Sequence, residues 1–150
     1  VHKHIDKMKI INHVKLITKF YKKRFKINPK VGVTGLNPHC ESNFNQNEED
    51  KIIKPAIKHL IKKNYKVTGP YPADTIFLKD NYKNFDVIIG MYHDQVLTPI
   101  KSIFGFDAIN ITLGLPFLRI SPDHGPNLKM FLKNKSDPSS LMLALQFLNK

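Results

Sequence analysis

Cysteine, tryptophan and long apolar runs are scarce or missing in this sequence. Cys40 is the single cysteine among 150 residues, and no tryptophan occurs. A lone cysteine excludes an internal disulfide framework and fits a reducing compartment. No apolar stretch is long enough for a signal peptide or a membrane-spanning helix. We therefore expect a soluble, cytoplasmic protein with no membrane partner.

The standard nucleotide-binding fingerprints are also missing, and arginine is scarce. Neither a P-loop nor a G-x-G-x-x-G run occurs. The formal net charge is +12, but only Arg24 and Arg119 among the 24 basic residues are arginine. Proteins that read nucleic acids usually depend on arginine, whereas here lysines are scattered along the whole chain. This pattern argues against a specific nucleic-acid partner, and it leaves non-specific binding of polyanions at low salt open.

The proportions of apolar and charged residues favour a globular domain. Hydrophobic residues make up 41% and charged residues 24% of the chain, which is enough apolar material for a core. The length predicts a single α/β unit over residues 1–150. Because the first residue is Val1 rather than methionine, we expect a processed chain or a piece of a longer protein.

Segments with helical periodicity alternate with short β-rich segments. Helices are expected at residues 3–26, at 48–64, from just after Gln95 to Ile103, and at 137–149. Strands are expected at residues 30–35, 86–90, 108–113 and 117–120. This alternation is typical of the α/β class, with a largely parallel or mixed sheet flanked by helices.

The helix at residues 48–64 opens with acidic residues. Glu48, Glu49 and Asp50 stand in its first turn, where the helix macrodipole favours negative charge. Its apolar positions are expected to face the core: Ile52, Ile53, Ile57, Leu60 and Ile61.

Two histidines follow predicted strands at the points where those strands end. His39 follows VGVTG, and His93 lies in the predicted loop Met91–Gln95 after DVIIG. Ligand crevices in open α/β sheets lie at the carboxyl ends of strands, so both imidazoles could reach one divalent transition metal. Asp94 could add a ligand or orient a ring. Two histidines are fewer than the usual three protein ligands, and spacing alone favours simple turn contacts instead.

Cys40 and the remaining histidines carry weaker signals. His124 follows a strand and fits a ligand contact or a turn contact equally well. Cys40 lies on an extended loop with no helix start or basic cluster to lower its pKa, which predicts an unreactive thiol. The other histidines are expected on solvated helix faces: His2, His4, His13 and His59.

Arg119 is informative because the chain uses lysine almost everywhere else. Its planar guanidinium binds phosphate or carboxylate at two points, and Lys101 and Asn110 on nearby elements could complete an anion pocket. The alternative is a structural salt bridge of Arg119.

Five motifs occur in a fixed order along the chain. They are G-L-N-P-H at 35–39, G-P-Y-P-A-D-T at 69–75, M-Y-H-D-Q at 91–95, N-I-T-L-G-L-P-F-L-R at 110–119 and S-P-D-H-G at 121–125. In this order they resemble the 4-hydroxythreonine-4-phosphate dehydrogenase family, throughout residues 1–125 and more loosely to the end. The resemblance implies an isocitrate/isopropylmalate-dehydrogenase-like fold, of which this chain is the C-terminal portion without the N-terminal half.

The resemblance also implies an activity in vitamin B6 biosynthesis. The family oxidises the C3 hydroxyl of 4-phosphooxy-L-threonine with NAD and a divalent cation such as zinc, magnesium or cobalt. The 2-amino-3-oxo-4-phosphooxybutanoate formed loses carbon dioxide to give 3-amino-2-oxopropyl phosphate. The family is a homodimer whose metal site is shared between the subunits.

The family's functional positions fall on particular residues here. The resemblance makes His39 and His93 two of three metal ligands, the third belonging to the half that precedes Val1. It implies that the substrate is bound by Lys101, Asn110 and Arg119. Cofactor contacts are expected at Asp123, His124 and Gly125, and no catalytic residue is assigned.

Three segments depart from the family pattern near the expected metal and cofactor region. Residues 40–47 contain no glycine where the family loop is glycine-rich, Val96 replaces a glycine, and Pro126-Asn127 replaces a small or hydroxylated pair. Glycine permits positive φ angles and close backbone approach, so we expect a reshaped loop.

Two other functions stay open besides this enzyme. A basic, non-enzymatic binding module or a decayed remnant would account for the +12 charge and the lost glycines. A related metal-dependent dehydrogenase of another hydroxy acid would use the same motifs. The isolated 150-residue chain is expected to be inactive, because it carries half of the site.

Overall fold

The computed structural model describes residues 4–40, 47–105, 107–125, 133 and 137–149. His2, the loop at residues 41–46 and the pair 126–127 therefore lie outside the described residues. The packing of the chain groups it into two compact units, Val1–Leu97 and Thr98–Lys150. In the described part of the chain, no helix combines the length and the apolar character needed to cross a membrane.

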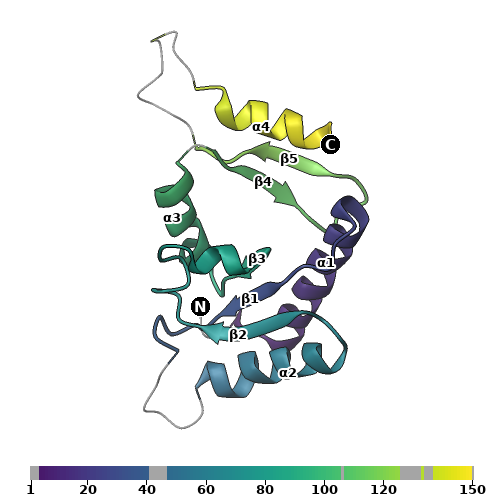
Figure 1. The fold of residues 1–150 in the computed structure, drawn as a ribbon, viewed down its shortest axis with the longest axis vertical. Coiled ribbons are helices and arrows are strands. Elements are labelled where there is room, and N and C mark those ends of the chain that lie inside the picture. The colour runs from purple at the N-terminus through teal and green to yellow at the C-terminus, as the bar shows by residue number, and fades with distance from the viewer. Residues whose placement is uncertain (1–3, 41–46, 106, 126–132, 134–136, 150) are drawn as a thin grey trace. The chain divides into compact units, whose positions relative to one another are not determined.

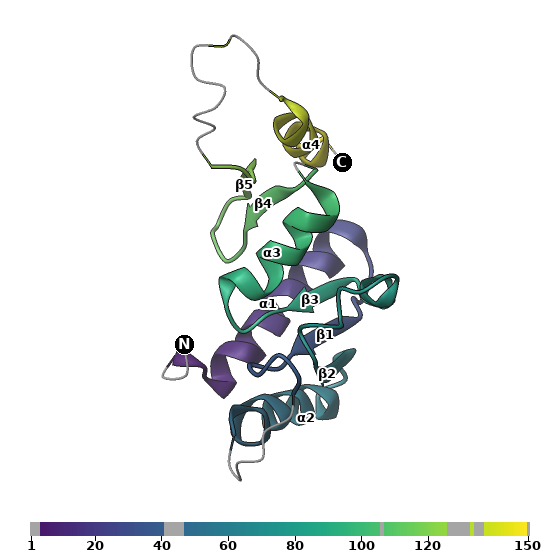
Figure 2. The ribbon, with the colours of Figure 1, turned by 90° about the vertical axis from the view of Figure 1, so that its left-hand side faces the viewer.

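The first unit is a three-stranded parallel sheet with helices packed on it. Strands β1 (Val31–Thr34), β2 (Val67–Tyr71) and β3 (Val87–Ile89) take the order β2-β1-β3, which places β1 in the centre (Figure 1). Helices α1 (Lys7–Phe25) and α2 (Lys54–Lys62) pack on each other, and α2 lies beside β2 in both views (Figures 1 and 2). Two short helices complete the unit: the π-helix η2 (Glu49–Ile53) and the 3-10 helix η3 (Asn81–Asn84).

Helix α1 begins four residues later than the predicted position because Asp6 caps it. The Asp6 Oδ2 atom accepts a hydrogen bond from the Lys9 backbone N–H at 3.1 Å, which satisfies one of the free donors of the first turn. The helix ends where Lys26 turns to a left-handed φ of 62°. Basic residues fill its last turn, where the macrodipole favours positive charge.

The core of the first unit lies between α1, α2 and the central strand. Ile11, Val14, Val31, Val33 and Leu60 are each at most 1% exposed. Burial of such a side chain stabilises the fold by about 1.5–3 kcal/mol. The predicted inward positions of the second helix are confirmed except at Ile61, which is 52% exposed at the edge of the apolar stripe.

A close approach between β1 and β2 explains one glycine. Gly69 has a φ of 133°, and a Cβ atom there would stand 2.4 Å from the Val33 carbonyl oxygen. The pairing of β1 with β2 shifts register between Gly32 and Thr34, beside this contact. A larger residue at position 69 would force the two strands apart.

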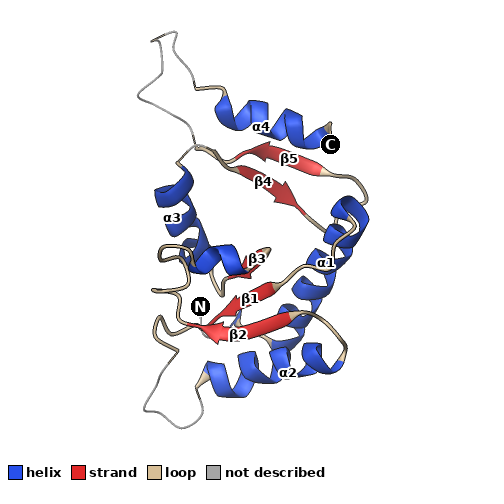
Figure 3. Cartoon of the chain, viewed as in Figure 1, coloured by secondary structure: helices blue, strands red, loops and turns tan. Residues whose placement is uncertain are grey.

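The second unit is a β-hairpin covered by a helix. Strands β4 (Ile109–Thr112) and β5 (Arg119–Pro122) pair antiparallel, and α4 (Ser139–Leu148) packs on them (Figure 3). Ser140 and Ala144 are the buried residues of α4. Helix α3 (His93–Phe104) carries the chain from one unit into the other. The predicted α/β class is confirmed, with one parallel and one antiparallel sheet.

Candidate functional site

The candidate metal residues stand at one edge of the parallel sheet. Strands β1, β2 and β3 run parallel, so their carboxyl ends lie on the same side of the first unit. His39 follows β1, Asp74 follows β2, and His93 follows β3. Each of the three strands therefore leads into a side chain of metal-ligand type. Among the residues that the structure describes, no three His, Cys, Asp or Glu side chains form a complete metal site by themselves.

His39 is oriented by a carboxylate from the neighbouring strand end. Its Nδ1 atom lies 2.8 Å from Oδ2 of Asp74, and its backbone N–H donates to Oδ1 of Asn37 at 3.0 Å. The His39 side chain is 70% exposed, so this pair contributes little to stability. Asp74 belongs to the motif at residues 69–75, but its type and spacing alone gave no reason to select it.

His93 has a similar carboxylate on its Nδ1 atom. Oδ1 of Asp94 lies 2.7 Å from it. This contact corresponds to the second alternative for Asp94, in which its carboxylate orients a histidine ring. The predicted loop at residues 91–95 is wrong at its end, because His93 opens α3 and stands in its first turn. Within the described residues, Nε2 of His39 and of His93 forms no hydrogen bond. In the described part of the chain, each ring thus has its Nδ1 atom held by a carboxylate and its Nε2 atom without a hydrogen-bond partner.

Glu49 holds the loop that carries His39. Its carboxylate is buried, and Oε1 accepts hydrogen bonds of 2.8 Å from the backbone N–H groups of Leu36 and Asn37. The sequence predicts Glu49 in the first turn of a helix, where negative charge is favoured. Glu49 does begin a helical segment, which is a π-helix. Its main contacts are with the loop rather than with its own helix.

Gln95 connects the ends of β1 and β3. The amide is buried, and its Nε2 donates to the Gly35 carbonyl oxygen at 2.8 Å. Its Oε1 accepts from the Met91 backbone N–H and from the Thr34 hydroxyl, both at 2.7 Å. Sequence reasoning missed this residue, since a glutamine two positions after a histidine carries no metal signal of its own.

Cys40 lies next to His39 but does not resemble a nucleophile. Burial raises the pKa of its thiol, and the charge of Glu49 raises it further, against a lowering contribution from a Gly35 backbone hydrogen bond. A protonated thiol at neutral pH agrees with the predicted unreactive cysteine. His4 and His13 are exposed as predicted, and His59 is half-buried.

The predicted substrate residues belong to the second unit. Thr112 pairs with Arg119 and Asn110 pairs with Ser121 across β4 and β5, so Asn110 and Arg119 share one face of the hairpin. The Nη1 atom of Arg119 donates to the Thr112 hydroxyl at 2.9 Å. Arg119 pairs with no carboxylate in the described part of the chain, so the alternative of a structural salt bridge is not observed.

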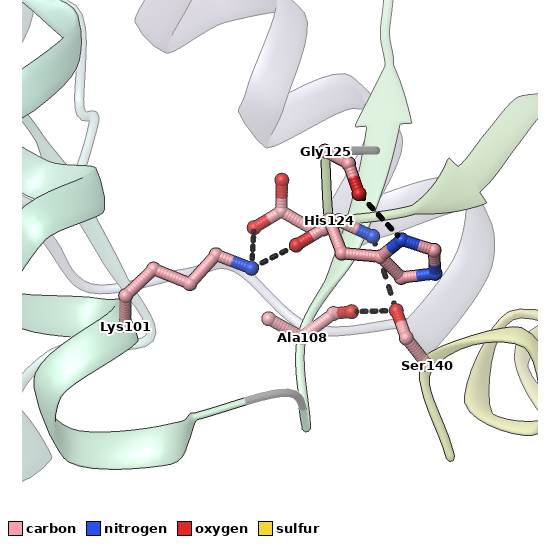
Figure 4. A network of polar contacts seen from close by, with 6 residues as sticks. Lys101, Ala108, His124, Gly125 and Ser140 are labelled. Carbon is pink, nitrogen blue, oxygen red and sulfur yellow. Dashed lines mark hydrogen bonds and ion pairs between the residues drawn. The ribbon is translucent and has the colours of Figure 1, made fainter. Parts of the chain in front are cut away.

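Lys101 takes part in a polar network with the end of β5 (Figure 4). Its ammonium lies 3.1 Å from Oδ2 of Asp123 and also donates to the Asp123 backbone oxygen. The Asp123 N–H donates to the Ser140 hydroxyl at 3.0 Å, and that hydroxyl donates to the Ala108 oxygen. The half-buried Lys101 is therefore held in a fixed direction by its anionic partner.

His124 makes a local hydrogen-bond contact with the residue that follows it. Its Nδ1 atom lies 3.3 Å from the Gly125 carbonyl oxygen (Figure 4), which corresponds to the turn alternative. No described atom lies within 4 Å of the position that a Cβ atom would take on Gly125.

Comparison with known proteins gives one consistent family. The family model described as "Pyridoxal phosphate biosynthetic protein PdxA" matches residues 1–148. A 4-hydroxythreonine-4-phosphate dehydrogenase from Sulfurihydrogenibium sp. is 47% identical over 144 residues, which are 95% of this chain and 44% of that protein. A relative from Oceanobacillus iheyensis with the provisional name D-threonate 4-phosphate dehydrogenase is 45% identical over 121 residues, which are 79% of this chain and 36% of that protein.

Solved structures agree with these relatives. A 4-hydroxythreonine-4-phosphate dehydrogenase from Klebsiella pneumoniae superposes with a TM-score of 0.79 at 31% identity, over 97% of this chain and 44% of that one. The same enzyme from Burkholderia phymatum gives a TM-score of 0.76 at 33% identity, over 96% of this chain and 44% of that one. The isocitrate/isopropylmalate-dehydrogenase-like fold predicted from the sequence is confirmed by this likeness. The chain spans less than half the length of the proteins it matches.

Proposed function

Since this chain belongs to the pyridoxal phosphate biosynthetic protein PdxA family, we propose that it forms part of an NAD-dependent dehydrogenase of 4-phosphooxy-L-threonine. The 2-amino-3-oxo-4-phosphooxybutanoate produced would lose carbon dioxide to give 3-amino-2-oxopropyl phosphate for pyridoxal 5'-phosphate synthesis. Because the matched relatives are more than twice as long, we assign this activity to a longer protein that contains the chain. The supporting observation is that three parallel strands lead to His39, Asp74 and His93.

The donor set at this edge fits a divalent metal ion. Imidazole nitrogen is a preferred ligand of zinc and cobalt, and a carboxylate on the other ring nitrogen fixes the tautomer and raises ligand basicity. His39 and His93 both have such a carboxylate on Nδ1 and an available Nε2. They would supply two ligands, and a third would come from outside this chain.

The hairpin of the second unit fits the anionic part of the substrate. Arg119 presents a planar guanidinium on the same face as Asn110. Two-point binding by arginine suits a phosphate or a carboxylate, and the amide adds a directional hydrogen bond. Lys101, held by Asp123, adds a positive charge whose direction is set before the substrate arrives.

The chain's own residues would bind and orient the substrate, while the cofactors supply the chemistry. When bound, a divalent cation lowers the pKa of a coordinated hydroxyl and polarises the ketone formed from it. The NAD that accepts the hydride would bind near Asp123, His124 and Gly125, after β5. A metal site shared between two subunits of a homodimer would complete the arrangement.

A metal titration of the isolated chain and an assay of the longer protein test this proposal. Cobalt binding should be measured by calorimetry for the 150-residue chain and for its His39→Ala and His93→Ala variants. We expect weak binding that each substitution abolishes, and no NAD reduction by the isolated chain. The longer protein should reduce NAD with 4-phosphooxy-L-threonine. Cobalt binding unchanged by both substitutions would overturn the metal assignment.

The relative named for D-threonate 4-phosphate raises a second dehydrogenase candidate with another substrate. The same metal and anion residues would serve both substrates, because each carries a phosphate and a hydroxyl group. A comparison of kcat/KM for the two substrates with the longer protein decides between them. The preferred substrate is the one with the larger value.

A basic groove on α1 favours a non-enzymatic candidate. Lys15, Lys19, Lys22 and Lys23 line it together with Thr18 and Tyr65, in keeping with the overall charge of +12. Lysine clusters bind polyanions by counterion release, and such binding is lost as salt rises. Binding of a single-stranded RNA that persists at physiological salt would support this candidate, and loss of binding there would exclude it.

A further inference from the structure

We propose that Gln95 is a positioning residue that sets the separation of the two histidine-bearing segments. This inference rests on the proposed metal site of His39 and His93. Gln95 does not contact the metal in this proposal. It acts by fixing where the two strand ends stand relative to each other.

The amide of Gln95 joins segments that are distant in the sequence. It donates to the Gly35 carbonyl oxygen at 2.8 Å, after β1, and accepts from the Met91 N–H at 2.7 Å, after β3. The Thr34 hydroxyl, at the last residue of β1, adds a third bond of 2.7 Å. All three bonds are made by a side chain that is 7% exposed.

Each bonded segment leads directly to a candidate ligand. His39 lies four residues after Gly35, and His93 lies between Met91 and Gln95. Residues 35–37 are also held from the other side, because Gly35 N–H donates to the Tyr71 oxygen at 2.9 Å and Glu49 accepts from Leu36 and Asn37. These hydrogen bonds together restrict the position of the segment that precedes His39.

The chemistry of the position requires an amide. The Gly35 carbonyl needs a donor, whereas Met91 N–H and the Thr34 hydroxyl need an acceptor, and glutamine provides both in one group. A glutamate would place a buried negative charge against the Gly35 carbonyl oxygen. A leucine would leave the Met91 N–H and the Gly35 oxygen without these partners.

Glycines allow close packing in both segments that Gln95 joins. A Cβ atom on Gly90 would stand 2.3 Å from Val96 Cγ2 and 3.3 Å from Gln95 Oε1. A Cβ atom on Gly35 would stand 2.5 Å from the Cys40 sulfur. The two glycines therefore let their segments pack closely, Gly90 against Val96 and Gln95, and Gly35 against Cys40.

The test uses the longer protein loaded with cobalt, whose absorption spectrum reports the geometry of its ligands. In Gln95→Glu we expect cobalt affinity to fall by about 10–100-fold, as for other residues that orient metal ligands, together with an altered visible spectrum. Thr34→Val keeps the side-chain shape but removes the bond to Gln95 and the 3.2 Å contact of the same hydroxyl with the Ile89 carbonyl oxygen, and should give a smaller loss of about 3–10-fold. Gln146→Glu, at an exposed position of α4, is the matched control and should bind cobalt normally.

Separate outcomes identify which idea fails. If both variants, Gln95→Glu and Thr34→Val, have a lower melting temperature but normal cobalt affinity and a normal spectrum, Gln95 has only a structural role and the inference is overturned. If His93→Ala keeps normal cobalt binding, the proposed metal site itself is wrong. If Gln95→Glu does not fold, Thr34→Val alone decides between the positioning role and the structural one.

Discussion

Oδ2 of Asp74 lies 2.8 Å from Nδ1 of His39, although the two residues are 35 positions apart in the sequence. The contact joins the carboxyl end of β2 to the carboxyl end of β1. It gives the sequence motif at residues 69–75 a physical role, because the carboxylate directs the His39 ring and leaves its Nε2 atom available.

Removal of the negative charge at Asp74 should weaken metal binding without unfolding the protein. We expect Asp74→Asn in the longer protein to lower cobalt affinity about 10-fold, since an amide supports the imidazole less strongly than a carboxylate. Calorimetry measures this change. Asp80→Asn is the control, because Asp80 is an exposed partner of Lys83. Equal affinities in both variants would show that Asp74 does not act through His39.

Glu49 should contribute to stability through its two backbone hydrogen bonds. Glu49→Ala leaves the half-buried N–H groups of Leu36 and Asn37 without these acceptors, at a total cost of about 1–3 kcal/mol because water can reach them in part. Urea unfolding of the 150-residue chain measures the loss. Asp50→Asn, which removes an exposed ion pair with Lys54, should leave the unfolding midpoint unchanged. Similar midpoints for both variants would contradict the role of Glu49.

The thiol of Cys40 should react slowly. Because burial and the charge of Glu49 raise its pKa, the thiolate fraction near pH 8 lies below that of free cysteine. A thiol reagent followed by absorbance should therefore modify Cys40 more slowly in the folded chain than in urea, and the rate should keep rising above pH 9. Equal rates for the folded chain and the urea-unfolded chain would disprove the protected thiol.

The sequence predicted those features that depend on local pattern. The strands at 31–34 and 87–89 and the histidines after them follow from apolar runs and their ends, and the buried face of α2 follows from the spacing of Ile57 and Leu60. The prediction that Ile61 faces the core was wrong. Successive side chains on a helix point in directions about 100° apart, and Ile61 lies beyond the edge of the buried apolar stripe.

The partners of polar side chains did not follow from local pattern. Gln95, Glu49 and Asp74 act on backbone or side chains 12 to 61 positions away, according to which strands pair and in what register. Neither hydrophobic periodicity nor residue type contains this information. The family motifs pointed to the correct segments, but they did not distinguish a ligand from the residue that holds it.

Arg119 should bind the substrate and leave the metal site unaffected. Arg119→Lys keeps the charge but removes the planar fork, so two-point contact with a phosphate or carboxylate is lost. In the longer protein we expect KM for 4-phosphooxy-L-threonine to rise about 10-fold or more, with cobalt affinity unchanged. Steady-state kinetics and calorimetry on the same preparation measure both quantities. Arg24→Lys, in the last turn of α1, is the matched control and should leave KM unchanged. If cobalt affinity falls and KM does not change, Arg119 acts on the metal site rather than on the substrate. The substrate-binding role proposed for the hairpin would then be wrong.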